Sequence, residues 1–229
     1  MNDDKKEKML FYDRFADQFD SKMNMYDTNK RLQVIFEELL TEDLKGKHLL
    51  DAGSGTGWFS RAATQRGAQV VSLDVGESIL AQVAKKCNSR RIVGSVLDIP
   101  LDKEQFDIVI STEVIEHTPD PRKAIQEMHR VLKKDGVLIL TVPNKIWHPA
   151  IVIANILHLR PYEGYENWVG WFELQKWLCE AGFSLVEIKG IHLFPFVLPF
   201  TLPLLSYFDK FGKVLGPCML NTCVRCVKK

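Results

Sequence analysis

Short apolar runs alternate with helix-length amphipathic segments between residues 47 and 143. The runs are rich in Val, Ile and Leu, as expected of strands that helices cover on both faces. Strands are predicted at residues 48–51, 69–73, 91–93, 106–110 and 136–142. Helices are predicted between them at residues 58–66, 77–86 and 121–134. This alternation predicts an α/β fold with a doubly wound, mostly parallel sheet.

The flanking segments follow other patterns. Before the first strand, residues 13–22 and 29–44 predict helices, the second with an apolar stripe formed by Leu32, Ile35, Phe36 and Leu39. After residue 143, the pattern predicts helices at 149–159 and 171–181 and strands at 183–188 and 220–227. No repeat or linker divides the chain. We therefore expect one domain, with a helical cap (1–46), a core (47–143) and a third region (144–229).

The segment from Ile191 to Phe208 is strongly apolar and contains Pro195, Pro199 and Pro203. Each proline removes a backbone donor, which argues against a straight transmembrane helix. Three alternatives remain open: a buried crossover beside the sheet, a lid over an apolar substrate, and a surface for peripheral contact with a membrane or a protein.

Composition narrows the class of protein. The 229 residues carry a formal net charge of +1, which argues against a nucleic-acid partner. The charged N-terminus lacks the apolar region of a secretory signal, and five cysteines show no disulfide spacing. These features predict a cytoplasmic protein. Cys223 and Cys226 lie three apart on a predicted strand, so they point to opposite faces and are expected to be buried structural cysteines.

A glycine-rich turn, Asp51 to Gly57, follows the first predicted strand. Glycines there let a ligand approach the backbone and the N-terminus of the next helix. Asp74 ends the second strand, 19 residues after Gly55, where a carboxylate can accept hydrogen bonds from ribose hydroxyls. The two features predict a nucleotide-type site at the carboxyl ends of the strands.

Two familiar nucleotide sites fit this turn poorly. The third glycine of a dinucleotide fingerprint would fall at Trp58, and no Lys-Ser/Thr pair follows the glycines as in a P-loop. Asp51 would repel a pyrophosphate but suits an ammonium group. The pattern therefore favours a nucleoside that carries an amino acid and a sulfonium.

Four segments resemble the motifs of class I S-adenosylmethionine-dependent methyltransferases. They follow one another in the family's order and spacing over about residues 47–143. The matching segments are DAGSGTG at 51–57, LDVGESIL at 73–80, FDIVISTEVIEHTPDP at 106–121 and RVLKKDGVL at 130–138. The third segment is most similar to the quinone-biosynthesis (ubiquinone and menaquinone) methyltransferases and their small-molecule relatives.

This resemblance implies a Rossmann-like sheet of seven strands with an antiparallel last strand, and inserts after the fifth and sixth. It implies S-adenosyl-L-methionine as cofactor and S-adenosyl-L-homocysteine as product. Asp51 and the glycine turn would meet the methionine portion, Asp74 the ribose and Val75 the adenine. The cofactor-binding residues implied in this way are Asp51, Ala52, Gly53, Ser54, Gly55, Gly57, Asp74, Val75, Ser95, Val96, Thr112 and Glu113.

Two further contacts come from the N-terminal region. The segment that begins at Tyr12 resembles a helix that closes over the cofactor in relatives. Arg31 would reach the cofactor carboxylate, with a solvated helix face as its alternative. Relatives often have Gly-Asp-Ala before the fourth strand, whereas this chain has Gly94-Ser95-Val96, so either Ser95 or the nearby Asp98 would replace the aspartate.

His117 is the best-placed candidate base, because it follows the fourth strand and histidine titrates near neutrality. Its alternative role is a loop hydrogen bond, and His148 and His158 rank second. No metal is predicted, although Glu113, Glu116 and His117 carry suitable donors and some related quinone O-methyltransferases use a divalent metal there. An aromatic set would shape a pocket for a flat acceptor, unless Trp171 and Trp177 belong to the core: Trp147, Tyr162, Tyr165, Trp168, Trp171 and Trp177.

The sequence thus predicts methyl transfer to a small, hydrophobic acceptor, with oxygen as the favoured nucleophile. The alternatives are N- or C-methylation of a small molecule, and a non-catalytic subunit that keeps the fold and contacts a partner. The intact glycine turn and Asp74 argue against the subunit.

Overall fold

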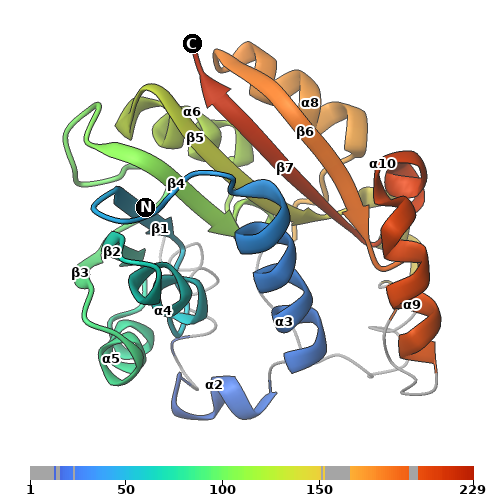
Figure 1. Ribbon diagram of the computed structural model, residues 1–229, viewed down its shortest axis with the longest axis horizontal. Helices are drawn as coiled ribbons and strands as arrows, with labels where there is room; N and C mark the ends of the chain where they lie inside the picture. Colours follow the sequence, from blue (N-terminus) through green and yellow to red (C-terminus); the bar gives the residue numbers. More distant parts are fainter. Residues whose placement is uncertain (1–12, 14–15, 23, 151, 153–165, 196–200) are drawn as a thin grey trace.

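The computed structural model describes residues 13, 16–22, 24–150, 152, 166–195 and 201–229. Its centre is a seven-stranded sheet with the strand order β3-β2-β1-β4-β5-β7-β6 (Figure 1). Neighbouring strands are parallel except β7, which runs antiparallel to β5 and β6. The strands are β1 (His48–Ala52), β2 (Gln69–Asp74), β3 (Arg90–Val93), β4 (Phe106–Thr112), β5 (Leu132–Pro143), β6 (Phe183–Ile191) and β7 (Asn221–Lys228). The predicted fold class and the antiparallel last strand are confirmed.

Helices cover both faces of the sheet (Figure 1). One face packs under α6 (Pro121–Val131) and α8 (Trp171–Glu180). The other packs under the π-helix η2 (Val34–Leu39) and α4 (Trp58–Gln65). Side chains along a strand alternate between the two faces of the sheet. Cys223 and Cys226 of β7 are three residues apart and therefore lie in opposite cores. Both cysteines are fully buried, as predicted.

Three helices complete the part of the fold that surrounds the site. Helix α5 (Glu77–Lys86) follows β2, while α2 (Ala16–Lys22) and α3 (Met25–Gln33) precede the sheet in sequence. In Figure 1, α2 and α3 lie beyond the ends of the central strands, on the side to which their carboxyl ends point.

Two predicted helices have different ends in the structure. The helix predicted at 29–44 begins at Met25, because Asn24 caps it by accepting hydrogen bonds from Tyr26 N and Asp27 N. It continues as the π-helix η2 and stops where Leu40 turns extended. The helix predicted at 121–134 ends at Val131, because Leu132 is already extended and pairs with Phe106 of β4. Most of the helix predicted at 149–159 lies outside the described residues.

The Ile191–Phe208 segment divides into parts. Ile191 and His192 are fully buried, and residues 196–200 lie outside the described part of the chain. From Leu202 the chain forms α9 (Leu202–Phe208), the 3-10 turn η6 (Asp209–Phe211), α10 (Gly212–Leu215) and the 3-10 turn η7 (Gly216–Cys218). None of the helices in the described part of the chain has the length and apolar character to cross a membrane.

Candidate active site

A cavity of about 540 Å³ opens at the carboxyl ends of β1, β2 and β4. Parallel strands bring their carboxyl ends to one edge of the sheet, which is where doubly wound folds bind ligands. The predicted cofactor residues in its wall are Gly53, Ser54, Gly55, Asp74, Val75, Ser95, Val96, Thr112, Glu113 and Arg31. The predicted base His117 lines the same cavity, whereas Asp51, Ala52 and Gly57 do not.

The glycine turn needs its glycines for two different reasons. Gly53 has a φ of 81° and a Cβ there would lie 2.4 Å from Val114 Cγ2, so only glycine lets the turn pack on Val114. Gly55 has a φ of 50°, and a Cβ there would meet no atom within 4 Å. The backbone of Gly55 therefore faces open space in the cavity wall, where a ligand can approach it closely.

Asp74 fastens this turn to the end of β2. Its Oδ2 accepts a hydrogen bond of 2.9 Å from Gly55 N, and its Oδ1 accepts one of 3.1 Å from Gly76 N. Burial raises the pKa of the Asp74 carboxyl, against the lowering effect of these backbone donors. The carboxylate is thus held at the cavity wall beside the glycine turn.

Asp51 lies behind the turn. Its Oδ2 accepts a 2.6 Å hydrogen bond from Ser60 Oγ, which is 2.6 Å from Ser72 Oγ; Ser72 in turn is 2.7 Å from Ser89 Oγ. Asp51 is fully buried, and burial raises the pKa of its carboxyl to about 7. A buried acid with one hydroxyl partner favours its neutral form, unless a cation comes near.

Helix α2 is fastened to the glycine turn by Asp20. The Asp20 carboxylate accepts hydrogen bonds from Thr56 Oγ1 at 2.6 Å and Trp58 Nε1 at 3.1 Å, and it pairs with Lys86 Nζ at 2.5 Å. Lys86 also donates to the backbone oxygen of Thr56. These donors lower the pKa of Asp20 despite the opposing effect of partial burial. Helix α2 is therefore held over the turn by charge-assisted hydrogen bonds.

Arg31 of α3 is buried at the cavity wall, so the alternative of a solvated helix face is wrong. Its Nη2 donates to Asp27 Oδ2 at 2.5 Å, and its Nε has no hydrogen-bond partner among the described residues. The Asp27 carboxylate raises the pKa of Arg31 against the effect of burial, so the guanidinium stays charged. A buried cation with a donor to spare suits an anionic group in the cavity.

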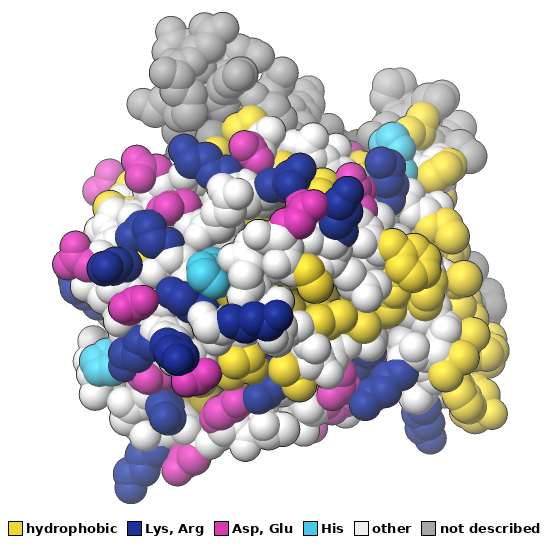
Figure 2. Space-filling model, turned by 90° about the horizontal axis from the view of Figure 1, so that it is seen from above, with side chains coloured by type: hydrophobic (Ala, Val, Ile, Leu, Met, Phe, Trp, Pro, Cys, Tyr) yellow, Lys and Arg dark blue, Asp and Glu magenta, His cyan; other side chains and the backbone are white. Residues whose placement is uncertain are grey.

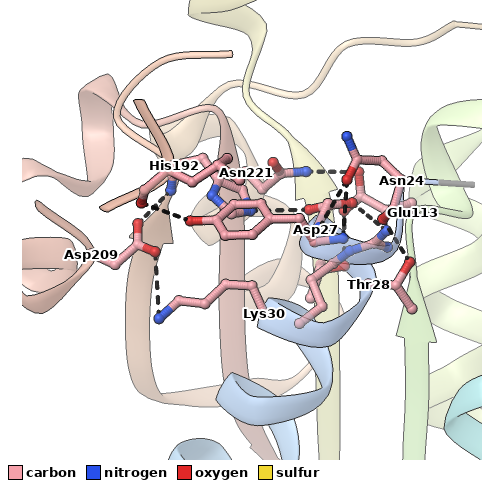
Figure 3. Close-up of polar contacts among 12 residues, drawn as sticks. Asn24, Asp27, Thr28, Lys30, Glu113, His192, Asp209 and Asn221 are labelled. Carbon is pink, nitrogen blue, oxygen red and sulfur yellow. Dashed lines mark hydrogen bonds and ion pairs between the residues drawn. The ribbon is translucent and has the colours of Figure 1, made fainter. Parts of the chain in front are cut away.

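The Asp27 carboxylate also connects α3 to the C-terminal region (Figure 3). Its Oδ1 lies 3.2 Å from His192 Nε2, just after β6. The backbone N of His192 donates to Asp209 Oδ1 at 2.7 Å, and Asp209 pairs with Lys30 of α3 at 3.4 Å. Burial would raise the pKa of Asp27, but Arg31 and His192 together hold it below its ordinary value. Two segments distant in sequence thus meet at the Asp27 carboxylate, and Asp209 is joined to both of them through His192 N and Lys30.

Beyond β4, two buried glutamates and His117 lie along the cavity. Glu113 has a φ of 55°, and its carboxylate accepts hydrogen bonds from Thr141 Oγ1 at 2.9 Å and Asn221 Nδ2 at 2.8 Å. Glu116 Oε2 has no hydrogen-bond partner among the described residues, while its Oε1 is 3.9 Å from His117 Nε2. Burial raises the pKa of both glutamates, and the carboxylates of Glu113 and Glu166 raise the pKa of Glu116 further. The described residues contain no group of three or more donors arranged to hold a metal ion.

The remaining predicted residues fall into three groups. Ser95 lines the cavity and Asp98 does not. Trp168 lines the cavity, Trp171 is buried and Trp177 packs against the core, while Trp147 Nε1 donates to Cys218 O. His148 is exposed and stacks near Trp168. Tyr12, His158, Tyr162 and Tyr165 lie outside the described residues.

The comparisons with known proteins agree with this geometry. A family model described as a methyltransferase domain matches residues 50–140. A ubiquinone biosynthesis O-methyltransferase from Coxiella burnetii is 33% identical over 177 residues, which cover 72% of this chain and 74% of that protein. The chain belongs to the class I S-adenosylmethionine-dependent methyltransferases.

A second sequence relative and one solved structure are also similar to this methyltransferase. A ubiquinone biosynthesis O-methyltransferase from Pseudomonas aeruginosa is 34% identical over 161 residues, covering 65% of this chain and 69% of that protein. The solved structure of an S-adenosylmethionine-dependent methyltransferase from Thermotoga maritima, described as a possible histamine N-methyltransferase, superposes with a TM-score of 0.70. It covers 97% of this chain and 100% of that chain at 17% identity, a likeness that shows the fold.

The cofactor of this methyltransferase is S-adenosyl-L-methionine, and the cavity fits it. The open space beside Gly55 admits the ligand to the backbone, and Asp74 presents a carboxylate at the end of β2. Val75, Ile79 and Val96 supply apolar wall, and Arg31 supplies a buried cation.

Several residues in the wall of the methyltransferase cavity were missed by the sequence analysis. Asn24, Asp27 and Thr28 come from α3, and Glu166 comes from beyond β5. The i, i+4 spacing of Asp27 and Arg31 was the available signal, since such pairs meet on one face of a helix. It was overlooked because the predicted helix began only at residue 29.

The Asp51 carboxyl predicts a specific pH dependence of stability. Its folded-state pKa of about 7 exceeds the unfolded value, so between roughly pH 4 and 7 only the unfolded chain releases the proton. The free energy of unfolding therefore falls as pH rises through this range. We expect Asp51→Asn to gain roughly 2–3 kcal/mol relative to the wild type between pH 5 and 8. Urea unfolding at pH 5 and pH 8 measures the free energies of unfolding, with the exposed Asp102→Asn as control. The same stability difference between Asp51→Asn and the wild type at both pH values would contradict the prediction.

The Asp20 contacts predict a role for α2 in cofactor affinity. Asp20→Ala removes the bonds to Thr56, Trp58 and Lys86, so the turn loses its cover and affinity for S-adenosylhomocysteine should fall about tenfold. Gln18→Ala is the control, because Gln18 lies on the same helix and is exposed. Isothermal titration calorimetry distinguishes the variants. Equal affinities would show that α2 does not hold the cofactor.

Proposed function

We propose that this methyltransferase transfers the methyl group of S-adenosyl-L-methionine to an oxygen atom of a small, hydrophobic acceptor. The observation that carries the proposal is one continuous cavity lined at once by the glycine turn with Asp74 and by His117 with Trp168. Donor and acceptor can therefore meet in one cavity. The names of the curated relatives, both O-methyltransferases, support oxygen as the nucleophile.

We infer a single domain, in which residues 1–46 form the cap, 47–143 the cofactor-binding core and 144–229 the acceptor region. In the core, Asp74 would accept hydrogen bonds from the ribose hydroxyls, because its carboxylate already accepts from two backbone amides beside the cavity. Val75, Ser95 and Val96 would surround the adenine. The backbone from Gly53 to Gly55 would pass along the methionine portion.

The ends of the methionine portion would meet opposite charges. The buried guanidinium of Arg31, whose Nε has no hydrogen-bond partner in the described part of the chain, would hold the carboxylate. Asp51 would act on the ammonium through its charge from behind the turn, since its side chain contacts Ser60 and does not line the cavity. A nearby cation would stabilise the ionised form of Asp51, which burial alone disfavours.

The chain's part in the reaction would be positioning and proton removal. The bound cofactor supplies an electrophilic methyl group on sulfur. The cavity wall, including Pro143 and Trp168, would hold the acceptor hydroxyl in line with that group and exclude water. His117 would accept the hydroxyl proton, and its Nε2 lies 3.9 Å from Glu116 Oε1.

We also propose that the enzyme works at the periphery of a membrane. A hydrophobic acceptor partitions into lipid, and the apolar segment 191–208 includes helix α9, on which Leu204 and Tyr207 are exposed. Helix α3, which contributes Asp27 and Arg31 to the cavity wall, contacts α9, because Tyr26 Oη donates to Leu202 O at 3.3 Å.

The proposal predicts methyl transfer to hydroxylated aromatic compounds by the chain alone. Incubation with methyl-labelled S-adenosylmethionine and a panel of phenols, quinols and anilines should label hydroxyl compounds. His117→Ala should lower kcat by about a hundredfold or more while leaving calorimetric binding of S-adenosylhomocysteine unchanged. His48→Ala is the matched control, because His48 is exposed at the start of β1 and does not line the active-site cavity.

Three results would count against this assignment. Labelling of the anilines alone would make nitrogen the nucleophile. Full activity in His117→Ala would remove the histidine from proton transfer. Binding of S-adenosylhomocysteine without transfer to any compound, combined with activation of a co-purified methyltransferase, would favour a non-catalytic subunit.

A further inference from the structure

The helical run from α9 to η7 has two opposite faces. Its inward face consists of Leu205, Asp209, Gly212 and Gly216, spaced four, three and four residues apart. A Cβ on Gly212 would lie 2.3 Å from Gly190 O of β6, and one on Gly216 would lie 2.3 Å from the Trp171 ring. The run therefore packs closely against β6 and α8, and its opposite side faces away from them.

The outward side carries Leu204, Tyr207, Phe211 and Val214, spaced three, four and three residues apart. Residues at these spacings share one face of a helix. Tyr207 is 54% exposed and Val214 is 78% exposed. Tyr207 and Phe211 stack with ring centroids 5.6 Å apart. We call these four residues the apolar face; Figure 2 shows hydrophobic side chains gathered along the right-hand edge, where Figure 1 places α9 and α10.

The charges beside the apolar face are basic. Lys210 and Lys213 are exposed on the same run, whereas the one acidic residue in it, Asp209, is buried against Lys30. Lys213 contacts Glu187 at 2.9 Å but keeps a largely exposed side chain. An amphipathic helix with an apolar face bordered by lysines is the pattern of segments that lie in the plane of a membrane surface.

Helix α9, which carries Leu204 and Tyr207 of the apolar face, contacts helix α3 of the active site. Tyr26 of α3 contacts Leu202 O and Ser206 Oγ of α9, each at 3.3 Å. Helix α3 presents Asp27 and Arg31 to the cavity. A surface docked through α9 would therefore lie one helix away from the site.

We propose that the apolar face docks on the surface of a bilayer that contains anionic lipids, with Leu204, Tyr207, Phe211 and Val214 entering the interface and Lys210 and Lys213 meeting the lipid phosphates. The charge argues for lipid over a second copy of this chain, because a symmetric dimer through this face would bring its lysines together. This inference deepens the proposed function by stating how an enzyme with a lipid-soluble acceptor reaches it.

Flotation with vesicles tests the docking directly. The full chain should bind vesicles of phosphatidylcholine with 30% phosphatidylglycerol and bind pure phosphatidylcholine at least about fivefold more weakly. Phe211→Ser with Val214→Ser should lower binding to the anionic vesicles about tenfold or more. Lys210→Glu should lower it as well and reduce its salt dependence. Phe172→Ser is the matched control, because Phe172 is 74% exposed on α8, outside the apolar face.

The results separate this inference from the proposed activity. Failure of the wild type to bind anionic vesicles, or equal binding by the Phe211→Ser, Val214→Ser variant, would overturn the docking face. A dimer in analytical ultracentrifugation that this double variant dissociates would assign the face to a second copy. S-adenosylhomocysteine affinity and transfer to a water-soluble phenol are measured on the same variants; if both persist while vesicle binding is lost, the docking face is supported independently of catalysis.

Discussion

The arrangement around the cavity depends on the two contacts of the buried Asp27 carboxylate. It pairs with Arg31 on its own helix and lies beside His192 after β6, so it connects the N-terminal cap to the C-terminal region. A buried carboxylate and guanidinium are each costly to desolvate, and removing one leaves the other unpaired. The α3 helix is therefore fixed where it can present Arg31 to the cavity. The backbone N of His192 also donates to Asp209, which connects this contact to the helical run that bears the apolar face.

A second constraint is the convergence of the strand ends. The glycine turn, Asp74 and the Glu113–His117 segment follow β1, β2 and β4, which are neighbours in the sheet. Left-handed backbone at Gly53, Gly55 and Glu113 turns these segments into the cavity. A left-handed glutamate is unfavourable unless its surroundings hold it, and the Glu113 carboxylate is held by Thr141 of β5 and Asn221 of β7. Strands β5 and β7 thus support the segment that follows β4 at the cavity.

The sequence predicted the core of the fold because its signals there are local. Hydrophobic runs set the strands, and the spacing of Gly55 and Asp74 placed both at one edge of the sheet. The helix ends were less predictable: Asn24 capping begins α3 early, and pairing with β4 draws Leu132 into a strand. Asp27 was missed because the predicted helix began only at residue 29, and its contact with His192 joins segments distant in sequence. The predicted contact of Asp51 with the methionine portion stays a prediction; its side chain lies behind the turn against Ser60, from where it would act through its charge.

The central claim is that the glycine turn and Asp74 form the cofactor site, and calorimetric titration with S-adenosylhomocysteine tests it most directly. The wild-type protein should bind with a micromolar dissociation constant, and Asp74→Ala should bind at least about a hundredfold more weakly, because the ribose loses its charged acceptor. Asp98→Ala is the control, since Asp98 is exposed and lies outside the cavity wall. Absence of binding in the wild type, or equal binding by a folded Asp74→Ala protein, would contradict the claim.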